Sequence, residues 1–384
     1  MAIARTPRMP NGLETTLPSS WYTQQSVFDL EREHIFMREW LCVGRVEDLA
    51  GPGDHRLLDI FGESVILLRN TKGELRAFYN VCRHRGARLC AHVTDGDSPI
   101  RGGIGKKTIT CPYHAWTYDL DGQLIRAPHM APENGVGEDF DAAAIRLHPV
   151  GVATWGGFIF VNMTPQDAPD FEAQTAPFTS KWHRYGLGDL RVADTIHYKA
   201  HANWKILCEN YNECYHCGPV HPELCRIVPA FRDGGGGSLD WEGGVPHRDG
   251  AVTFTASGAT SRRAFPALNE AEQTRHFGEL IFPNLFISLA CDHVAAFVLH
   301  PQGPARCTID CHFLFEPYEM EKKEFDPSDA VDFWHLINRQ DWAICERVQQ
   351  GVSSRVHKAG LCAPMEDWTL DVRQYVTDRI GAYV

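Results

Sequence analysis

Two cysteine–histidine pairs carry the most specific chemistry in this sequence. Cys82 and His84 lie in "NVCRHRGARLC", and Cys111 and His114 lie in "TITCPYHAWTYDLDG". A C-x-H pair followed by a C-x-x-H pair is the ligand set of a Rieske [2Fe–2S] cluster, in which two thiolates bind one iron and two imidazoles bind the other. Because neutral imidazoles replace two anionic thiolates, such a cluster is easy to reduce and suits electron transfer from a flavin or ferredoxin donor.

Two other interpretations of these residues remain open. A zinc ribbon or finger prefers C-x(2–4)-C pairs or a distal pair of histidines, so the spacing disfavours zinc. Cys90 and His92 repeat the C-x-H spacing and could replace the first pair. The "RHRG" context favours Cys82 and His84 as the ligands.

Hairpins are predicted next to both pairs. Residues 64–82 form two apolar, β-branched runs around a Gly turn, and the second run ends at Cys82. Residues 115–127 alternate around Asp121-Gly122, a strong short hairpin signal, directly after His114. The polar, Gly-rich stretch 85–110 is interpreted as a connection between the two ligand loops. We therefore predict a β-rich domain over 45–165 that holds a cluster in two loops.

Length, charge and cysteine usage limit the class of protein. A chain of 384 residues predicts two domains. The net charge of −12 argues against general nucleic-acid binding, which requires a basic face. The sequence has no apolar signal-peptide region near its start and no apolar run of about 18 residues. The 13 cysteines are therefore expected to be reduced thiols, apart from cluster ligands, in a cytoplasmic protein that does not bind membranes.

The remaining segments predict an α+β fold. Apolar spacing predicts a helix over 26–42, and the N-terminal segment 1–44 is expected to pack on the second domain. Helical and strand patterns mix over 166–384, as in an α+β domain. Start signals at 327–329 predict a long last helix over 328–352. Four consecutive glycines within 232–244 indicate a mobile loop that could cover a pocket.

A second set of metal ligands is predicted between residues 201 and 223. Glu213 and His216 are three residues apart, so they share one face of a predicted helix. The Gly-Pro pair at 218–219 is expected to interrupt this helix, so that His221 can turn back toward His216. Two imidazoles and a carboxylate, which need not lie nearby in sequence, form the triad of non-haem Fe(II) oxygenases. This triad leaves positions open for dioxygen.

Less specific interpretations of this stretch also remain. His216 and His221 could be ordinary core or surface histidines. Cys214 and Cys217 match the C-x-x-C of thioredoxin-like redox motifs. Such motifs follow a strand in a βαβ unit, whereas these two cysteines fall in a predicted helix.

Together these motifs resemble the oxygenase (α) component of Rieske non-haem iron ring-hydroxylating-type oxygenases. The resemblance covers nearly the whole chain and includes "NWK" at 203–205, "ENYNECYH" at 209–216 and "NRQDWAICERVQQGV" at 338–352. It implies a Rieske domain followed by a catalytic domain over 166–384 with a curved antiparallel sheet covered by helices (helix-grip, START-like). It also implies that Asp341 completes an iron triad with His216 and His221, with Glu346 as the rival carboxylate.

One departure from the family pattern concerns electron transfer. Most members have an Asp three residues before the first iron histidine, where this chain has Glu213. The resemblance makes Glu213 the bridge between a Rieske histidine, His114, of one subunit and His216 of the next. It therefore implies a homotrimer.

The form "ENYNECYHC" resembles the family branch that acts on quaternary ammonium compounds such as glycine betaine, stachydrine and carnitine. This resemblance implies hydroxylation of an N-methyl group, which yields a demethylated amine and formaldehyde. O2 would be the co-substrate, and NAD(P)H would supply electrons through a separate flavin and iron–sulfur reductase. A cationic head can be held by aromatic faces. The candidates near the motifs are Tyr211, Trp241, Phe254, Phe282 and Phe286.

Two other functions remain open. A Rieske oxygenase could instead hydroxylate or O-demethylate an aromatic acid, in which case Arg or Lys should line the pocket. A protein of another class, a Rieske electron carrier, would contain two irons per chain and not three.

A local excess of basic residues surrounds the cluster motifs. Part of this patch could dock an acidic electron donor, where charge complementarity mainly raises the association rate. Alternatively, Arg83 and Arg85 brace the cluster loops. The basic residues are Arg83, Arg85, Arg88, Arg101, Lys106 and Lys107.

Overall fold

The computed structural model describes residues 13–91, 103–130, 140–237 and 239–384. The chain forms two compact units. Residues Met37–Pro169 form one, here called the insert unit. The chain up to Phe36 joins Asp170–Val384 in the other, here called the main unit. These bounds differ from the predicted ones at 44/45 and 165/166, and they group the described N-terminal residues with the second half of the chain.

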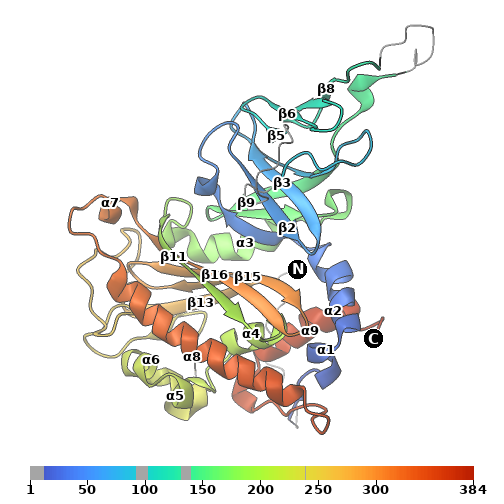
Figure 1. Ribbon diagram of the computed structural model, residues 1–384. Coiled ribbons are helices and arrows are strands. Elements are labelled where there is room, and N and C mark those ends of the chain that lie inside the picture. Colours follow the sequence, from blue (N-terminus) through green and yellow to red (C-terminus); the bar gives the residue numbers. More distant parts are fainter. Residues whose placement is uncertain (1–12, 92–102, 131–139, 238) are drawn as a thin grey trace. The chain divides into compact units, whose positions relative to one another are not determined.

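The insert unit contains two antiparallel sheets, with strand orders β1-β10-β9-β4-β3-β2 and β5-β6-β7-β8 (Figure 1). The predicted hairpins are confirmed as β3–β4 and β7–β8. The stretch expected to be only a connection contains β5 and β6. The strands are β1 Leu41–Arg45, β2 His55–Ile60, β3 Glu63–Arg69, β4 Leu75–Tyr79, β5 Gly103–Ile104, β6 Thr108–Thr110, β7 Thr117–Asp119, β8 Leu124–Arg126, β9 Pro149–Trp155 and β10 Phe158–Asn162.

The β7–β8 turn illustrates why the sequence folds locally here. The Asp119 carboxylate accepts hydrogen bonds from the backbone of Asp121 and Gln123 at 2.9 and 2.8 Å. Gly122 has a φ of +82°, and a Cβ there would lie 2.6 Å from the Phe78 ring. The turn therefore needs glycine for both its backbone conformation and its packing.

The two ends of the insert unit lie side by side. Strand β1 near its start pairs with β10 near its end, with Leu41 opposite Val161. Trp40 Nε1 donates to the Pro169 carbonyl oxygen at 2.8 Å, and Asn162 Nδ2 donates to that of Arg38 at 2.7 Å. The chain thus enters and leaves this unit at one place.

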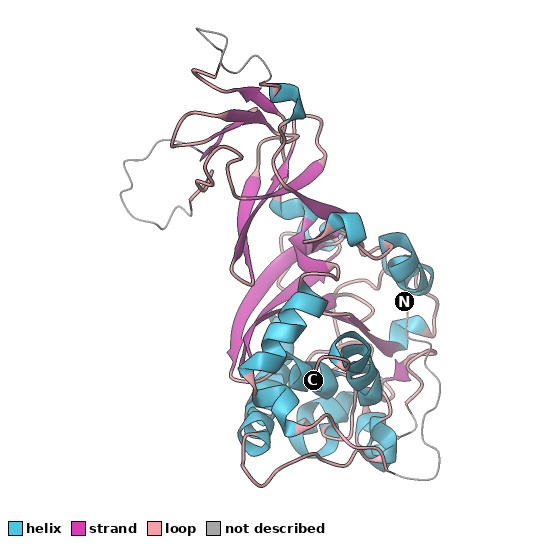
Figure 2. Ribbon diagram, turned by 90° about the vertical axis from the view of Figure 1, so that its right-hand side faces the viewer, coloured by secondary structure: helices cyan, strands magenta, loops and turns pink. Residues whose placement is uncertain are grey.

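The main unit contains a six-stranded antiparallel sheet of order β11-β16-β15-β14-β13-β12. Helix α8 packs on one face, where Tyr198 Oη and His335 Nδ1 are 2.9 Å apart. Helix α3 packs on the other, where the Trp182 and Phe277 rings are 5.3 Å apart. Figure 2 shows the strands curving beside the helices. The strands are β11 Arg191–Ala200, β12 Val245–Pro246, β13 Arg275–Ile281, β14 Leu285–Leu289, β15 Val294–Gly303 and β16 Arg306–Phe315.

The helices of the main unit confirm the predicted α+β fold class. The predicted helix over 328–352 is confirmed as α8. The one predicted over 26–42 is wrong beyond Phe36, because a π-helix over Arg32–Phe36 ends it and β1 follows. No helix in the described ranges is long and apolar enough to span a membrane. The α-helices are α1 Ser19–Thr23, α2 Gln25–Glu31, α3 Phe171–Trp182, α4 Trp204–Tyr211, α5 Cys217–Val220, α6 Pro222–Ile227, α7 Pro317–Met320, α8 Ser328–Val352 and α9 Thr369–Ile380.

Candidate functional site

The four predicted cluster ligands lie in two loops of the insert unit, one after β4 and one between β6 and β7. The Cys82 amide donates to the Ala87 carbonyl oxygen at 2.9 Å. The Cys111 amide donates to the Trp116 carbonyl oxygen at 2.8 Å. Each loop is therefore closed by its own backbone hydrogen bonds.

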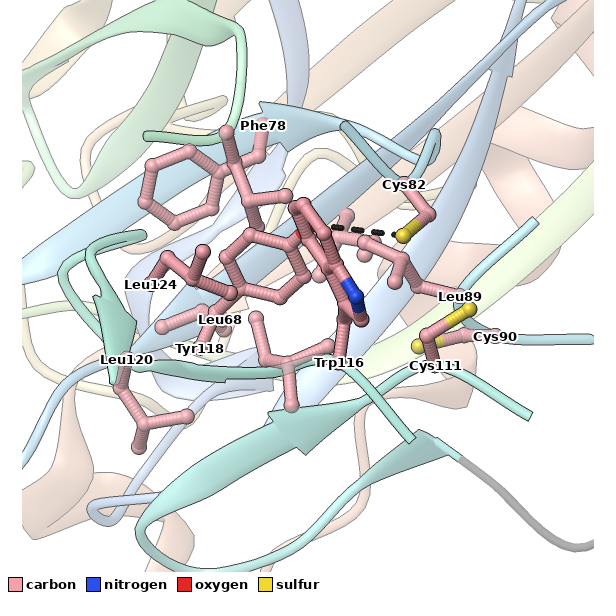
Figure 3. Packing of buried hydrophobic residues seen from close by; sticks show 13 residues of the cluster. Leu68, Phe78, Cys82, Leu89, Cys90, Cys111, Trp116, Tyr118, Leu120 and Leu124 are labelled. Atoms are coloured by element: carbon pink, nitrogen blue, oxygen red, sulfur yellow. Dashed lines mark hydrogen bonds between the residues drawn. The ribbon is translucent and has the colours of Figure 1, made fainter. Parts of the chain in front are cut away.

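The thiols of this site are buried and the imidazoles are exposed. Cys82 and Cys111 are each 3% exposed and belong to the hydrophobic cluster in Figure 3. His84 and His114 are exposed, with ring centroids 4.7 Å apart. Two inward thiols and two outward imidazoles fit a Rieske cluster whose histidine-bound iron lies at the surface. Burial raises the pKa of Cys82, and cluster iron would favour the thiolate that it binds.

Tyr118 places a polar group next to the Cys82 thiol. Its buried hydroxyl lies 3.3 Å from Cys82 Sγ and accepts from the Arg83 amide at 3.1 Å. Tyr118 can therefore donate to a Cys82 thiolate. Cys90 lies in the same hydrophobic cluster, and burial raises its pKa to about 12. Its alternative partner His92 lies outside the described residues.

Some residues of the predicted basic patch make contacts that brace the cluster loops. Arg83 Nη1 donates to the Arg146 carbonyl oxygen at 2.8 Å, and the Arg85 guanidinium lies 5.7 Å from the Tyr113 ring centre. These contacts fit the bracing interpretation for both arginines. Arg101 lies outside the described residues. Arg88, Lys106 and Lys107 are also exposed.

The predicted iron ligands converge in the main unit. One donor atom from each of His216, His221 and Asp341 lies within 4.8 Å of the others. Asp341 Oδ1 is 2.9 Å from His221 Nε2 and 3.3 Å from His216 Nε2. Burial alone would raise the pKa of Asp341, but hydrogen bonds from both histidines lower it to about 2. An anionic carboxylate beside two imidazole nitrogens is the donor set of a non-haem Fe(II) site.

The local backbone at this site differs from the prediction. Helix α4 ends at Tyr211, so Glu213 and His216 do not share a helix face. Residues 218–219 lie inside α5, so they do not interrupt a helix; the breaks are at 212–216 and at His221. Glu213 accepts from the His216 amide at 3.1 Å and contacts His216 Nδ1 at 2.5 Å. This side chain satisfies an amide that a continuous helix would otherwise use.

Neighbouring side chains orient both histidines. His221 Nδ1 lies 2.8 Å from Gln340 Oε1, and Gln340 Nε2 donates to Glu223 at 3.1 Å. Because Nδ1 of each imidazole is engaged, Nε2 is left to bind a metal. The rival Glu346 is used elsewhere, because its carboxylate accepts from the His201 amide at 2.9 Å.

A cavity adjoins the triad. Three of the five predicted aromatic residues, Tyr211, Trp241 and Phe254, line it. Phe282 stacks on Tyr375 and Phe286 stacks behind Tyr211, with centroids 4.2 and 4.5 Å apart, and neither lines the cavity. Lining residues that sequence reasoning missed include Phe231, His276, Gly278, Trp334, Ile337 and Trp368.

Some of these could have been found from spacing. Ile337 and Trp334 precede Asp341 by four and seven residues on the predicted helix, so they share its face. A glycine inside an apolar strand pattern, as at Gly278, marks a place where a ligand can approach. No local signal indicates Trp368, which lies just before α9.

The glycine-rich segment packs against the loop that carries Glu213. Gly236 has a φ of +74°, and a Cβ there would lie 2.9 Å from Cys214 Cβ. Phe231 and Trp241, near the two ends of the segment, have ring centroids 6.0 Å apart and both line the cavity. The glycines thus permit close packing beside the triad.

Comparisons with known proteins agree with this geometry. The "Rieske [2Fe-2S] domain" family matches residues 39–153, and the "Ring hydroxylating alpha subunit (catalytic domain)" family matches 187–382. The chain is 30% identical to the glycine betaine monooxygenase oxygenase subunit of Chromohalobacter salexigens, over 90% of this chain and 81% of that protein. It is also 30% identical to the carnitine monooxygenase oxygenase subunit of Acinetobacter baumannii, over 89% and 86%.

A solved structure gives the same result. The quaternary ammonium Rieske monooxygenase CntA, in complex with its substrate γ-butyrobetaine, superimposes with a TM-score of 0.71. The two chains are 25% identical, and the match covers 96% of each. These matches confirm the resemblance predicted from the motifs, and they imply a Rieske cluster and a mononuclear iron. The chain therefore belongs to the family of Rieske oxygenase α subunits and is an oxidoreductase of its monooxygenase branch.

Proposed function

We propose that this subunit hydroxylates an N-methyl group of a quaternary ammonium compound. O2 is the co-substrate, and a separate flavin and iron–sulfur reductase delivers electrons from NAD(P)H. The observation that carries the proposal is the cavity, in which the three candidate iron ligands share a lining with aromatic rings. The names of the relatives, glycine betaine and carnitine monooxygenase oxygenase subunits, support the substrate class.

The aromatic lining suits a cation that carries methyl groups. Trp241 lies 6.0 Å from Phe231 and 6.2 Å from Trp368 between ring centroids. Each ring face that meets an ammonium group contributes about 0.5–2 kcal/mol, with the larger values in desolvated sites. Several faces together can replace the water around a trimethylammonium head without a counter-ion.

Trp334 is held rigidly in this lining. Its Nε1 donates to His293 Nε2 at 2.9 Å, and His293 Nδ1 lies 2.8 Å from the Asp292 carboxylate. Asp292 in turn accepts from Arg262 Nε at 2.9 Å. Because this buried network fixes the indole, the wall beside the triad is preorganised before a substrate binds.

We assign the iron to His216, His221 and Asp341, and the cluster to Cys82, His84, Cys111 and His114. When bound, the cluster supplies electrons and the mononuclear iron supplies activation of O2. Gln340 and Glu213 keep the imidazoles of His221 and His216 oriented. The buried walls of the cavity hold the amine in place and exclude bulk water.

Glu213 is assigned as the inter-subunit bridge. Its Oε1 contacts His216 Nδ1, its Oε2 accepts from the His216 amide, and the exposed 10% of the side chain is where a partner would contact it. In a homotrimer, that partner is His114 of the partner subunit. This assignment rests on the family resemblance together with the Glu213–His216 contact.

The proposed reaction has two steps, hydroxylation and loss of formaldehyde. One N-methyl group, O2, two electrons and two protons give an N-hydroxymethyl group and water. The C–N bond of this carbinolamine then breaks with its electron pair staying on nitrogen. The hydroxyl proton passes to the amine, and formaldehyde leaves.

A turnover assay tests the proposal. The holoenzyme, with a surrogate reductase and NADH, is given glycine betaine, L-carnitine, choline and, separately, methoxybenzoates. We expect formaldehyde from at least one quaternary amine, in equal amount to the NADH and O2 consumed, and three irons per chain. Formaldehyde from methoxybenzoates alone would assign the enzyme to aromatic acids, and two irons per chain would indicate an electron carrier.

A further inference from the structure

Gly278 lies inside strand β13 and lines the cavity. Its φ lies outside the left-handed region, so the backbone there does not require glycine. Glycine in a strand interior weakens the strand, and it commonly marks a site where a ligand comes close to the backbone. The presence of glycine at position 278 is therefore best explained by the space that the missing side chain leaves in the cavity.

That space is a recess with three identified walls. A Cβ at position 278 would lie 3.2 Å from Tyr211 Oη, 3.7 Å from His276 Nε2 and 3.7 Å from Trp241 Cζ3. Gly278 and His276 share a face of β13 because strand side chains alternate. The candidate iron ligands come instead from 216–221 and from α8. A substrate whose methyl group points to the triad thus has its far end at the sheet, and the Trp241 indole borders both its ammonium head and its far end.

The three side chains that wall the recess are uncharged, and the nearest charged residue of the cavity lining along β13, Glu279, is a carboxylate that lies 3.6 Å from Lys181 Nζ. The phenol of Tyr211 already donates to the Ile287 carbonyl oxygen at 2.7 Å. The His276 ring is 6% exposed and lies among Phe231, Trp241 and Phe254, at centroid distances of 6.0, 6.1 and 4.6 Å. Burial, with a smaller effect from His247, lowers the pKa of His276 to about 3, so the imidazole is neutral at physiological pH.

His276 also has hydrogen-bonding capacity to spare. Among the described residues, its buried Nδ1 has no hydrogen-bond partner. Its Nε2 borders the recess. A neutral imidazole nitrogen can bond a hydroxyl group, whereas a carboxylate placed there would be buried against three uncharged walls. Burying an uncompensated charge is far more costly than burying a bonded hydroxyl.

We propose that the recess at Gly278 selects quaternary ammonium compounds with a short, uncharged far end whose hydroxyl bonds His276. Gly278 and His276 are thereby specificity-determining residues. This inference rests on the proposed function and narrows its substrate class from glycine-betaine-like zwitterions to amino alcohols of the same length.

The first test needs no variant. Binding to the oxidised holoenzyme under anaerobic conditions is measured by calorimetry for choline, glycine betaine and propyltrimethylammonium. These three compounds share the ammonium head and end in a hydroxyl, a carboxylate and a methyl group. We expect choline to bind about 10-fold more tightly than either of the others. Equal or tighter binding of glycine betaine would overturn the proposal.

Variants then test whether Gly278 and His276 cause the preference for choline. Gly278→Ala should weaken choline about 10-fold by filling the recess, yet leave tetramethylammonium, which has no far end, within about 2-fold. Gly303→Ala, in strand β15, is the matched control because nothing lies within 4 Å of a Cβ there, and it should change neither ligand. In His276→Phe, the advantage of choline over propyltrimethylammonium should disappear. Equal losses for tetramethylammonium and choline in Gly278→Ala would place the head in the recess and contradict the inference.

Formaldehyde release reports on the proposed function separately. If glycine betaine binds more tightly and is demethylated, the recess is assigned wrongly while the function stands. If choline binds more tightly but no amine releases formaldehyde, the selectivity stands and N-demethylation is contradicted.

Discussion

The cluster residues lie between positions 82 and 114, whereas the candidate iron ligands reach from 216 to 341. The first set is held by turns whose hydrogen bonds close within a few residues, and its histidines are exposed. The second set joins two short helices to α8, and its histidines are oriented by Gln340 and Glu213. A site that exchanges electrons with other proteins can be a surface loop. A site that binds a small molecule needs surrounding walls, which only the whole fold supplies.

The strongest test of this contrast removes one ligand from the long-range site. Asp341→Ala should abolish retention of mononuclear iron, leaving two irons per chain with an intact cluster absorbance. Activity should fall by more than about 100-fold, because even losing a residue that orients a metal ligand costs 10–100-fold. Iron analysis and formaldehyde release measure the two effects.

Two further variants serve as controls for Asp341→Ala, one at the rival carboxylate and one at the cluster. Glu346→Gln keeps a side-chain oxygen that can accept from the His201 amide, so it should retain three irons. Cys111→Ser should show the reverse of Asp341→Ala, losing the cluster and keeping the mononuclear iron. Loss of both metals in either ligand variant would contradict the independence of the two sites.

The next effect comes from the layer behind the ligands. Gln340→Leu removes the partner of His221 Nδ1 and should weaken iron binding about 10–100-fold. Chelator competition measures this affinity. Glu223→Gln, one contact further out, is the control and should differ from wild type by less than a factor of about 3, since it can still accept from Gln340. An equal loss in both variants would mean that the whole segment had been disturbed.

A smaller effect is expected at the surface of the insert unit. Reversing Lys106 and Lys107 to Glu should slow cluster reduction about 10-fold at low ionic strength and flatten its salt dependence, if these exposed residues meet an acidic donor. Stopped-flow reduction at several salt concentrations measures both. The same substitutions should leave substrate affinity unchanged, and an unchanged reduction rate would exclude docking at these lysines.

The smallest expected effect is on the reduction potential of the cluster, through the hydroxyl of Tyr118. Tyr118→Phe removes the hydroxyl beside Cys82 Sγ while keeping the buried ring. A hydrogen bond to a thiolate stabilises the reduced, more negative cluster, so its loss should lower the reduction potential by on the order of 50 mV. Redox titration followed by visible spectroscopy measures the shift. A raised potential would mean that the hydroxyl does not donate to the sulfur.

The contrast between local and long-range contacts also explains which features could be predicted from the sequence. The hairpins beside Cys82 and His114 and the helix over 328–352 could be predicted because their signals are local. Asp341 required the family resemblance, because nothing in the residues alone links position 341 to His216. The helix predicted through Cys217 was wrong because the Glu213 side chain, and not the backbone, satisfies the His216 amide.

The cavity lining was the least predictable part. Phe286 points to the correct side of the sheet, opposite Leu280, but Tyr211 covers it. His276 and Trp368 reach the cavity from segments whose packing depends on elements far away in the chain. Proximity to a motif in sequence therefore identified Tyr211, Trp241 and Phe254 but not the walls supplied by the sheet and by the segment before α9.

The adjacent ends of Met37–Pro169 have a consequence for how such enzymes diversify. Strands β1 and β10 pair, and Trp40 donates a hydrogen bond to Pro169. The electron-accepting unit is therefore connected to the rest of the chain at two positions that lie next to each other. Segments inserted through adjacent ends can be exchanged without rethreading the host around them. Recombination at these two positions could thus replace the unit that accepts electrons. The cavity of the main unit, and the range of substrates that it binds, would not change.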